Sequence, residues 1–128
     1  MSASHDFSVR VWYEDTDLSG LVYHANYLKF IERARSEWVR GLGLDQAAMR
    51  AEGRVFVVVR IEADYLSPAR YGDLLEVATE VEEVRPARMM LRQIVRRDGA
   101  DLFAARVTLA LLGPDGRPGR LPEVLRPR

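Results

Sequence analysis

The sequence lacks cysteine altogether and contains a single lysine, Lys29. Without cysteine there is no disulfide framework, no thiolate metal site and no cysteine nucleophile, which is compatible with the cytoplasm as the expected location. With one lysine, most mechanisms that depend on a lysine side chain are excluded. The two histidines, His5 and His24, are too far apart in the sequence to suggest a zinc-binding pair.

The sequence also lacks an excess of charge of one sign and any long apolar run. The chain carries 19 basic and 19 acidic side chains, so its net charge gives no electrostatic case for a nucleic-acid partner. No apolar stretch approaches the ~20 residues of a membrane-spanning helix, and the first residues lack the basic start and apolar core of a secretory signal. We therefore expect a protein that is neither transmembrane nor secreted.

What is present is typical of one globular domain. Of the 128 residues, 48% are apolar and 30% are charged, and a chain of this length can bury a core without disulfides or metals. No internal repeat or linker divides it. We therefore expect a single domain over residues 1–128.

Two periodic segments open the chain. From Phe7 to Tyr13 apolar and polar residues alternate, which predicts a strand with one face in the core. After an acidic loop, apolar residues recur at spacings of three and four, which predicts a helix from about His24 to Arg40. The sequence GLGL at 41–44 is a stop signal, and Asp45 could cap a second short helix that ends near Glu52.

Four strands follow, with no alternation of strands and helices. The Asp98-Gly99 step before the last strand is typical of a hairpin, and Ser67–Asp73 is a loop. Consecutive strands with short turns form an antiparallel sheet, whose apolar face only the long helix is available to cover. The sequence therefore predicts an α+β domain in which a curved sheet wraps one long helix, with an irregular tail. In the first of these strands Ile61, Ala63 and Tyr65 alternate with charged residues, which predicts that they face the core. The predicted strands are Val55–Leu66, Leu75–Val84, Met89–Arg97 and Phe103–Leu112.

The stretch YEDTDLSGLVYHANY, residues 13–27, holds three carboxylates, a glycine turn and a histidine. Its D-x-D-x-S-G order fits the start of a calcium loop, but Asn26 stands where the bidentate glutamate is needed. Asp15, Asp17 and Ser19 also fit the nucleophile loop of haloacid-dehalogenase phosphatases, whose parallel sheet the pattern does not contain. Serine catalysis is weaker, because the sequence before Ser19 lacks the first glycine of G-x-S-x-G. An acidic turn that caps the next helix stays open as the non-catalytic alternative.

The start of the long helix adds a second feature to this loop. Backbone N–H groups near Tyr23 and His24 lack intrahelical acceptors, so they could polarise a carbonyl and hold the oxyanion that forms when it is attacked. A carboxylate a few residues away could attack that carbonyl or activate water. The ingredients of acyl hydrolysis are therefore present.

At these residues the sequence resembles a known family. VWYEDTDLSGLVYHANYLKFIERAR is similar to the signature of the hotdog-fold acyl-CoA thioesterases of the hydroxybenzoyl-CoA thioesterase class, and in particular to the YbgC type associated with the Tol-Pal cell-envelope system. ADYLSPARYGDLLEV and GRLPEVLR resemble later parts of that family, so the resemblance covers most of the chain. It implies the hotdog fold, a long helix wrapped by an antiparallel sheet, in agreement with the periodicities.

The resemblance also implies roles for single residues. Asp17, the second aspartate of the D-x-D, would attack the thioester carbonyl or activate water to do so. A backbone N–H of His24 or of its neighbour Tyr23 would hold the oxyanion. The His24 side chain would assist near the thioester, with local hydrogen bonding at the helix start as the alternative. Glu14 and Asp15 would shape the loop.

Other charged side chains are candidates outside the loop. A helix carboxylate is catalytic in another branch of these enzymes, but Glu32 stands three residues before Arg35, which favours a helix-surface ion pair. The nucleotide end of coenzyme A needs basic side chains, and the segment EVRPARMMLR supplies Arg85, Arg88 and Arg92, of which we favour Arg88. Each of these arginines could equally be a solvated side chain at a strand edge.

The implied function is hydrolysis of an acyl-CoA to a free acid and coenzyme A. Because coenzyme A is part of the substrate, no further cofactor and no metal is expected. An acyl-carrier-protein thioesterase and a non-catalytic acyl-CoA-binding module at the cell envelope are the alternatives; the D-x-D-x-x-G order argues against a hotdog dehydratase. The family pairs its sheets and places active sites between subunits, so we expect a homo-oligomer, a dimer or tetramer. An aromatic, short-chain or long-chain acyl group stays open.

Overall fold

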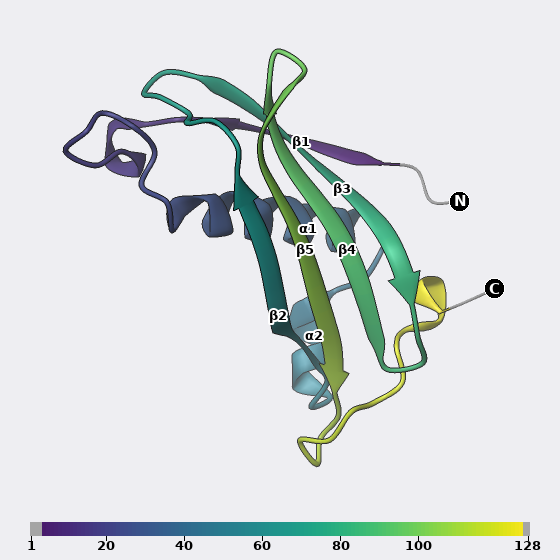
Figure 1. The fold of residues 1–128 in the computed structure, drawn as a ribbon. Coiled ribbons are helices and arrows are strands. Elements are labelled where there is room, and N and C mark those ends of the chain that lie inside the picture. The colour runs from purple at the N-terminus through teal and green to yellow at the C-terminus, as the bar shows by residue number, and fades with distance from the viewer. Residues whose placement is uncertain (1–3, 127–128) are drawn as a thin grey trace.

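The protein is an antiparallel sheet with one long helix across a single face (Figure 1). This computed structural model describes residues 4–126. The α+β class and the hotdog arrangement predicted from the sequence are confirmed. In chain order the helices and strands are β1 (His5–Arg10), α1 (Asn26–Gly41), α2 (Gln46–Ala51), β2 (Val55–Tyr65), β3 (Leu74–Val84), β4 (Arg88–Arg97) and β5 (Ala100–Leu112), with short 3-10 turns at Tyr13–Asp15 and Glu123–Leu125.

The five strands form one sheet in the order β1-β3-β4-β5-β2, and every pair is antiparallel. Four of these strands lie close to the predicted ranges. The hairpin between β4 and β5 turns at Asp98 and Gly99, whose φ angles of 52° and 81° are those that a two-residue hairpin turn requires. The predicted cap of α2 is also present, since the Asp45 carboxylate accepts hydrogen bonds from the N–H groups of Ala47 and Ala48.

The core lies between α1 and the inner face of the sheet. The apolar stripe predicted for the helix is buried, and α1 contacts β1, β3 and β4. Burial of this amphipathic stripe stabilises the helix in its place across the sheet. The fully buried large side chains of this core include Phe30, Ile31, Leu75, Leu91 and Phe103.

Two boundaries near the acidic loop differ from the prediction. The first strand ends at Arg10, and the chain then turns through the 3-10 turn, so Tyr13 is 83% exposed rather than part of the core face. The long helix begins at Asn26, two residues after the predicted start, because Tyr23–Ala25 form a turn before it. The alternation of apolar and polar residues from Phe7 to Tyr13 therefore extends beyond the strand itself, which ends at Arg10.

Strand β2 is an edge strand that the helix does not cover. Its alternation is as predicted, since inward-facing Ile61 and Tyr65 pair with buried Val107 and Phe103 of β5. However, β2 is exposed from Val58 to Tyr65, because α1 packs mainly against β1, β3 and β4 of the same face. The result is an uncovered row of apolar side chains along one edge.

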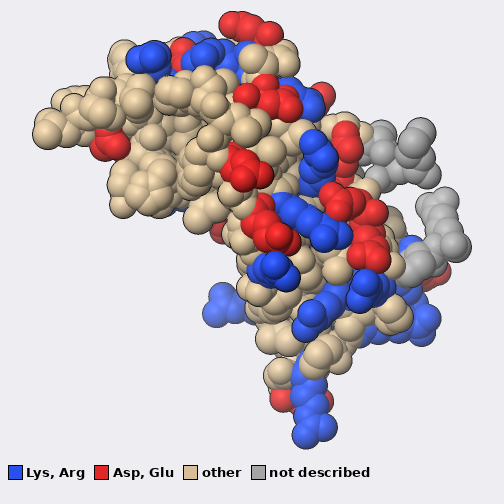
Figure 2. Space-filling model, in the orientation of Figure 1, with Lys and Arg blue, Asp and Glu red and all other residues tan. Residues whose placement is uncertain are grey.

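The outer face of the sheet is charged (Figure 2). Arg106 of β5 lies between Glu62 of β2 and Arg92 of β4, and its Nε is 2.7 Å from a carboxylate oxygen of Glu82. Exposed pairs of this kind contribute little to stability, typically less than about 1 kcal/mol each. Over residues 4–126, no helix is long and apolar enough to cross a membrane.

Candidate active site

The acidic stretch forms a tight loop that closes on itself. Thr16 and Val22 form an isolated antiparallel bridge, and the Asp17 N–H donates to the Leu21 carbonyl at 3.0 Å. The Asp17 carbonyl in turn accepts from the N–H of Gly20, whose φ of +80° favours glycine. The backbone around Asp17 is therefore fixed by bonds within five residues.

The Asp17 carboxylate lies at the surface with one oxygen engaged. Its Oδ1 accepts hydrogen bonds from the Ser19 hydroxyl and from the Ser19 N–H, the latter at 2.9 Å. These two bonds hold the pKa of Asp17 below its usual value, and the nearby His24 charge acts in the same direction. Oδ2 has no hydrogen-bond partner within residues 4–126. Asp17 is thus ionised at neutral pH, with one oxygen free to react.

Asp17 and His24 line the same cleft, which has a volume of about 280 Å³. One wall is polar and carries Asp17, Ser19 and His24. The remaining lining is largely apolar and comes from Leu21, Val22, Tyr27, Tyr65, Leu66, Ser67 and Pro68. A cleft with one polar and one apolar wall suits a ligand that joins a reactive polar group to an apolar body.

The structure separates the two N–H groups predicted to hold an oxyanion. The Tyr23 N–H donates to the Asp15 carbonyl at 3.0 Å, so it is not available to a substrate, and the prediction for Tyr23 is corrected. The His24 N–H has no acceptor within residues 4–126. Of the two predicted donors, only His24 therefore keeps an unpaired N–H beside the cleft, and its side chain lines the same cleft.

Asp15 holds the loop to the start of the helix. Its buried carboxylate accepts from the Trp12 N–H at 2.8 Å, and its carbonyl accepts from the side chain of Asn26 at 2.9 Å as well as from Tyr23. Asn26, which stands where a calcium loop would need a glutamate, therefore bonds to the loop backbone. Within residues 4–126, no group of three His, Asp or Glu side chains is placed to hold a metal ion.

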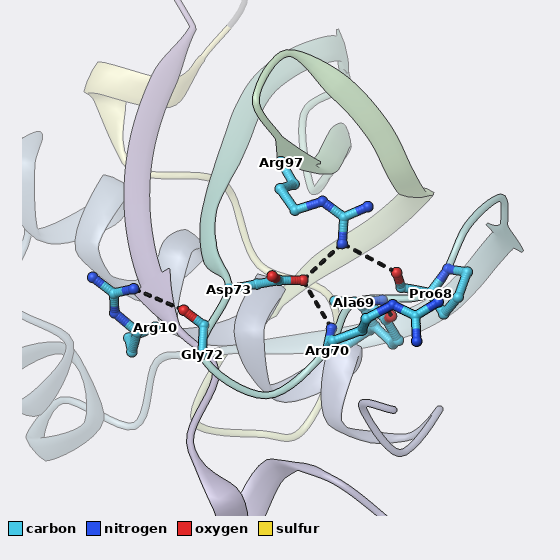
Figure 3. Close-up of polar contacts among 8 residues, drawn as sticks. Arg10, Pro68, Ala69, Arg70, Gly72, Asp73 and Arg97 are labelled. Carbon is cyan, nitrogen blue, oxygen red and sulfur yellow. Dashed lines mark hydrogen bonds and ion pairs between the residues drawn. The ribbon is translucent and has the colours of Figure 1, made fainter. Parts of the chain in front are cut away.

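Ser67 and Pro68 of the cleft belong to the loop Ser67–Asp73, which a polar cluster holds in place (Figure 3). Asp73 Oδ2 accepts from the Arg70 N–H at 2.8 Å and from Arg97 Nη1 at 2.7 Å. Burial raises the pKa of Asp73, but these donors outweigh it and hold the pKa below its usual value. Arg97 thus ties the end of β4 to the start of β3.

The same loop is bonded to the helix and to the acidic loop. The Ala69 N–H donates to the buried Tyr27 hydroxyl at 3.0 Å, and the Ala69 carbonyl accepts from the Val22 N–H at 2.9 Å. Burial raises the pKa of Tyr27, so its hydroxyl stays protonated. Neither this loop nor Tyr65, whose hydroxyl donates to the His24 carbonyl, was predicted as part of the site. The only signal in the sequence was that Tyr65 faces inward at a strand end.

The three arginines predicted to meet the nucleotide lie elsewhere. Arg85 and Arg88 flank the turn between β3 and β4, which is at the opposite end of the sheet from the acidic loop (Figure 1). Arg85 pairs with Glu83 at 3.3 Å, and Arg92 lines a groove on the outer face. The eleven residues of β3 span roughly 35 Å, which separates Arg85 and Arg88 from Asp17 of the same chain. Arg92 lies opposite Glu80 in the middle of β3, on the outer face, and also does not line the cleft of Asp17.

Glu32 and Arg35 do not form the predicted surface pair. Arg35 is half-buried and donates to Gln93 Oε1 at 2.9 Å, because its side chain turns under the helix toward β4. Burial lowers the pKa of Arg35, while the charge of Glu32 acts on it in the opposite direction. Both residues line a small cleft between α1 and the exposed strand β2, away from Asp17.

Comparison with known families agrees with this geometry. The model described as "Thioesterase superfamily" matches residues 19–104, more than half of the chain. The protein belongs to the thioesterase superfamily. The match begins just after Asp17 and covers His24, both α-helices, strands β2 to β4 and the start of β5.

Individual superfamily members are similar over most of their length. "Acyl-CoA thioester hydrolase YbgC" of Escherichia coli O6:H1 is 41% identical over 117 residues, which is 90% of this chain and 87% of that protein. "Acyl-CoA thioesterase YbgC" of Haemophilus influenzae is 46% identical over 105 residues, or 81% and 77% of the two chains. A crystal structure of a probable thioesterase from Bartonella henselae superposes with a TM-score of 0.89 at 38% identity, covering 94% of this chain and all of that one.

Proposed function

We propose that this protein is an acyl-CoA thioesterase, which hydrolyses an acyl-CoA to a free acid and coenzyme A. The observation that carries the proposal is the 41% identity to the acyl-CoA thioester hydrolase of E. coli over 90% of the chain. The site supports it, because an ionised carboxylate and an unpaired backbone N–H lie beside one cleft. These are the two groups that attack on a thioester carbonyl requires.

In the proposed reaction, Asp17 acts on the thioester through its free Oδ2. As a nucleophile, it would bond to the carbonyl carbon and expel the CoA thiolate, and water would then hydrolyse the resulting anhydride. As a general base, it would take a proton from a water that attacks directly. In both routes the His24 N–H stabilises the oxyanion, the His24 side chain assists near the thioester, and one water is consumed.

We further propose that the working unit is a homo-oligomer. Two observations favour this: the apolar row on β2 is uncovered, and Arg85, Arg88 and Arg92 are remote from Asp17 of the same chain. A second copy would cover the β2 edge, and its arginines, Arg88 first, would meet the phosphates of coenzyme A. Analytical ultracentrifugation should give a dimer or tetramer; a monomer at assay concentrations contradicts this arrangement.

The decisive experiment measures thiol release from a panel of benzoyl, short-chain and long-chain CoA esters. Asp17→Asn keeps the shape of the side chain and removes its charge, and we expect it to lose at least about 100-fold in kcat. Glu14→Gln is the matched control, since Glu14 is exposed in the adjacent turn and lines neither cleft beside Asp17. Equal rates for Asp17→Asn and wild type would refute the role of Asp17.

The same panel decides between the alternatives. Turnover of acyl carrier protein thioesters but not CoA esters would make the protein an acyl-carrier-protein thioesterase. Binding without turnover on either class would favour a non-catalytic module. The cytoplasmic location stays a prediction, which fractionation of cells that express the protein can test.

A further inference from the structure

We propose that Tyr65 is a positioning residue for this reaction, because its hydroxyl holds the carbonyl of His24 and so fixes the backbone that presents the His24 N–H. The inference rests on the proposed thioesterase function and adds a residue to it. Tyr65 lies at the end of β2, 41 residues from His24, and its hydroxyl is 2.8 Å from the His24 carbonyl oxygen.

Both peptide units that flank His24 are anchored. The Tyr23 carbonyl accepts from the Asn26 N–H at 2.8 Å, and it shares a planar peptide unit with the His24 N–H. The His24 carbonyl, in the next unit, accepts from Tyr65. With one bond on each side, neither soft dihedral of His24 is free to rotate. If the Tyr65 bond is lost, only the Tyr23 side stays fixed.

The ring of Tyr65 is held by its neighbours, so the direction of the hydroxyl is set. It packs edge-on against Phe103 at 5.0 Å, against Tyr27 at 5.6 Å and against the His24 ring at 6.3 Å between ring centroids. Tyr27 in turn stacks on Phe103 with nearly parallel rings. Edge-to-face contacts of this kind are favourable geometries for aromatic pairs. Tyr65 is thereby an ordered side chain although it is 52% exposed.

The Tyr65 hydroxyl positions the His24 backbone and does not donate its proton to the substrate. A tyrosine hydroxyl has one proton, and here that proton is engaged with the His24 carbonyl. The ring also contacts the His24 side chain, so both the N–H and the imidazole of His24 depend on the placement of Tyr65. A group that acts through His24 should change the rate of the chemical step more than the affinity for substrate.

The test is Tyr65→Phe, which keeps the ring contacts and removes only the hydroxyl. Misplacement of a catalytic group by about 1 Å can reduce rates about 100-fold, so we expect kcat to fall about 10- to 100-fold. KM should change less than about threefold, because the apolar wall of the cleft is intact. Arg117→Gln, a change in the exposed loop that follows β5 and away from the cleft, is the control and should keep wild-type kcat.

A second measurement tests the hydrogen bond from Tyr65 to the His24 carbonyl directly. In amide NMR spectra of Tyr65→Phe, the Ala25 N–H, which shares a peptide unit with the His24 carbonyl, should shift and exchange faster with solvent. A purely structural role predicts instead a lower melting temperature with unchanged kcat. An active wild type with an equally active Tyr65→Phe variant, or an unmoved Ala25 resonance, overturns the inference and leaves the thioesterase function standing. A wild type without turnover overturns the function itself, and the positioning role with it.

Discussion

Replacement of Gln93 by leucine should destabilise the protein far more than a surface change, because Gln93 joins three groups under the helix. Its side chain is fully buried. Its Nε2 donates to the Ile31 carbonyl of α1 and to the Thr79 hydroxyl of β3, both at 2.9 Å, and its Oε1 accepts from Arg35 at 2.9 Å. One amide thus links the helix to two strands.

The cost follows from what Gln93→Leu leaves behind. Leucine fills a similar volume, so little cavity energy is involved, but the bond to the charged Arg35 is lost, at about 1.5–3 kcal/mol. The buried Thr79 hydroxyl loses its partner, at about 1–3 kcal/mol. Because these contributions are coupled, we expect a total loss of about 3–5 kcal/mol in the free energy of unfolding. For a domain of this size that corresponds to a fall of about 10–20 °C in Tm.

Urea and thermal denaturation followed by circular dichroism measure this loss. Thr79→Val, which removes the hydroxyl and keeps the shape, should cost only about 1 kcal/mol. The double variant provides the sharper test: it no longer contains the orphaned hydroxyl, so it should be less destabilised than the sum of the two single variants. A loss below about 1 kcal/mol for Gln93→Leu, or strict additivity in the double variant, would refute the network reasoning.

Two further predictions concern carboxylates near the site. Ser19→Ala removes the hydroxyl that lowers the pKa of Asp17; the pKa should rise, so the acidic limb of the pH profile of kcat/KM should move to higher pH, and Ser19→Thr should restore it. An unmoved limb contradicts that role. Asp73→Asn should cost about 1.5–3 kcal/mol of unfolding free energy at pH 7 by weakening the contact with Arg97. Because the folded pKa of Asp73 is lowered, its contribution is present above the unfolded pKa of about 3.9 and lost as pH falls through the folded value, so the difference between variant and wild type should vanish in acid.

The fold was largely predictable, because its elements have strong local signals. Apolar runs, most of them with period-two alternation, marked β2 through β5, and a stripe at spacings of three and four marked α1. The antiparallel order followed from short turns such as Asp98-Gly99. What alternation does not contain is the position of a strand within the sheet. Ile61 and Tyr65 face inward as predicted, yet they are exposed because β2 is at an edge that α1 does not cover.

Sequence reasoning predicted only the part of the candidate site that is formed by residues close together in the chain. Asp17 and His24 are seven residues apart and line one cleft, as expected. The details that depend on hydrogen-bond partners were not foreseen: the Tyr23 N–H is taken by Asp15, and Arg35 bonds to Gln93, 58 residues away. Periodicity gives the face on which a side chain lies, but its partner across such a distance depends on the register of the whole sheet.

The Asp17 carboxylate and the His24 backbone are therefore held by different parts of the chain, and kinetic measurements can distinguish their roles. The Asp17 carboxylate is held by Ser19 within a loop that closes on itself, whereas the His24 backbone depends on Tyr65 from a distant strand. Tyr65→Phe should thus lower kcat at every pH without moving the acidic limb, because the environment of the carboxylate is unchanged. Ser19→Ala should move the limb while the Ala25 amide resonance stays in place. If either variant produced the signature of the other, the carboxylate and the oxyanion-holding backbone would have to be a single coupled unit, and the local closure of the loop would not isolate them.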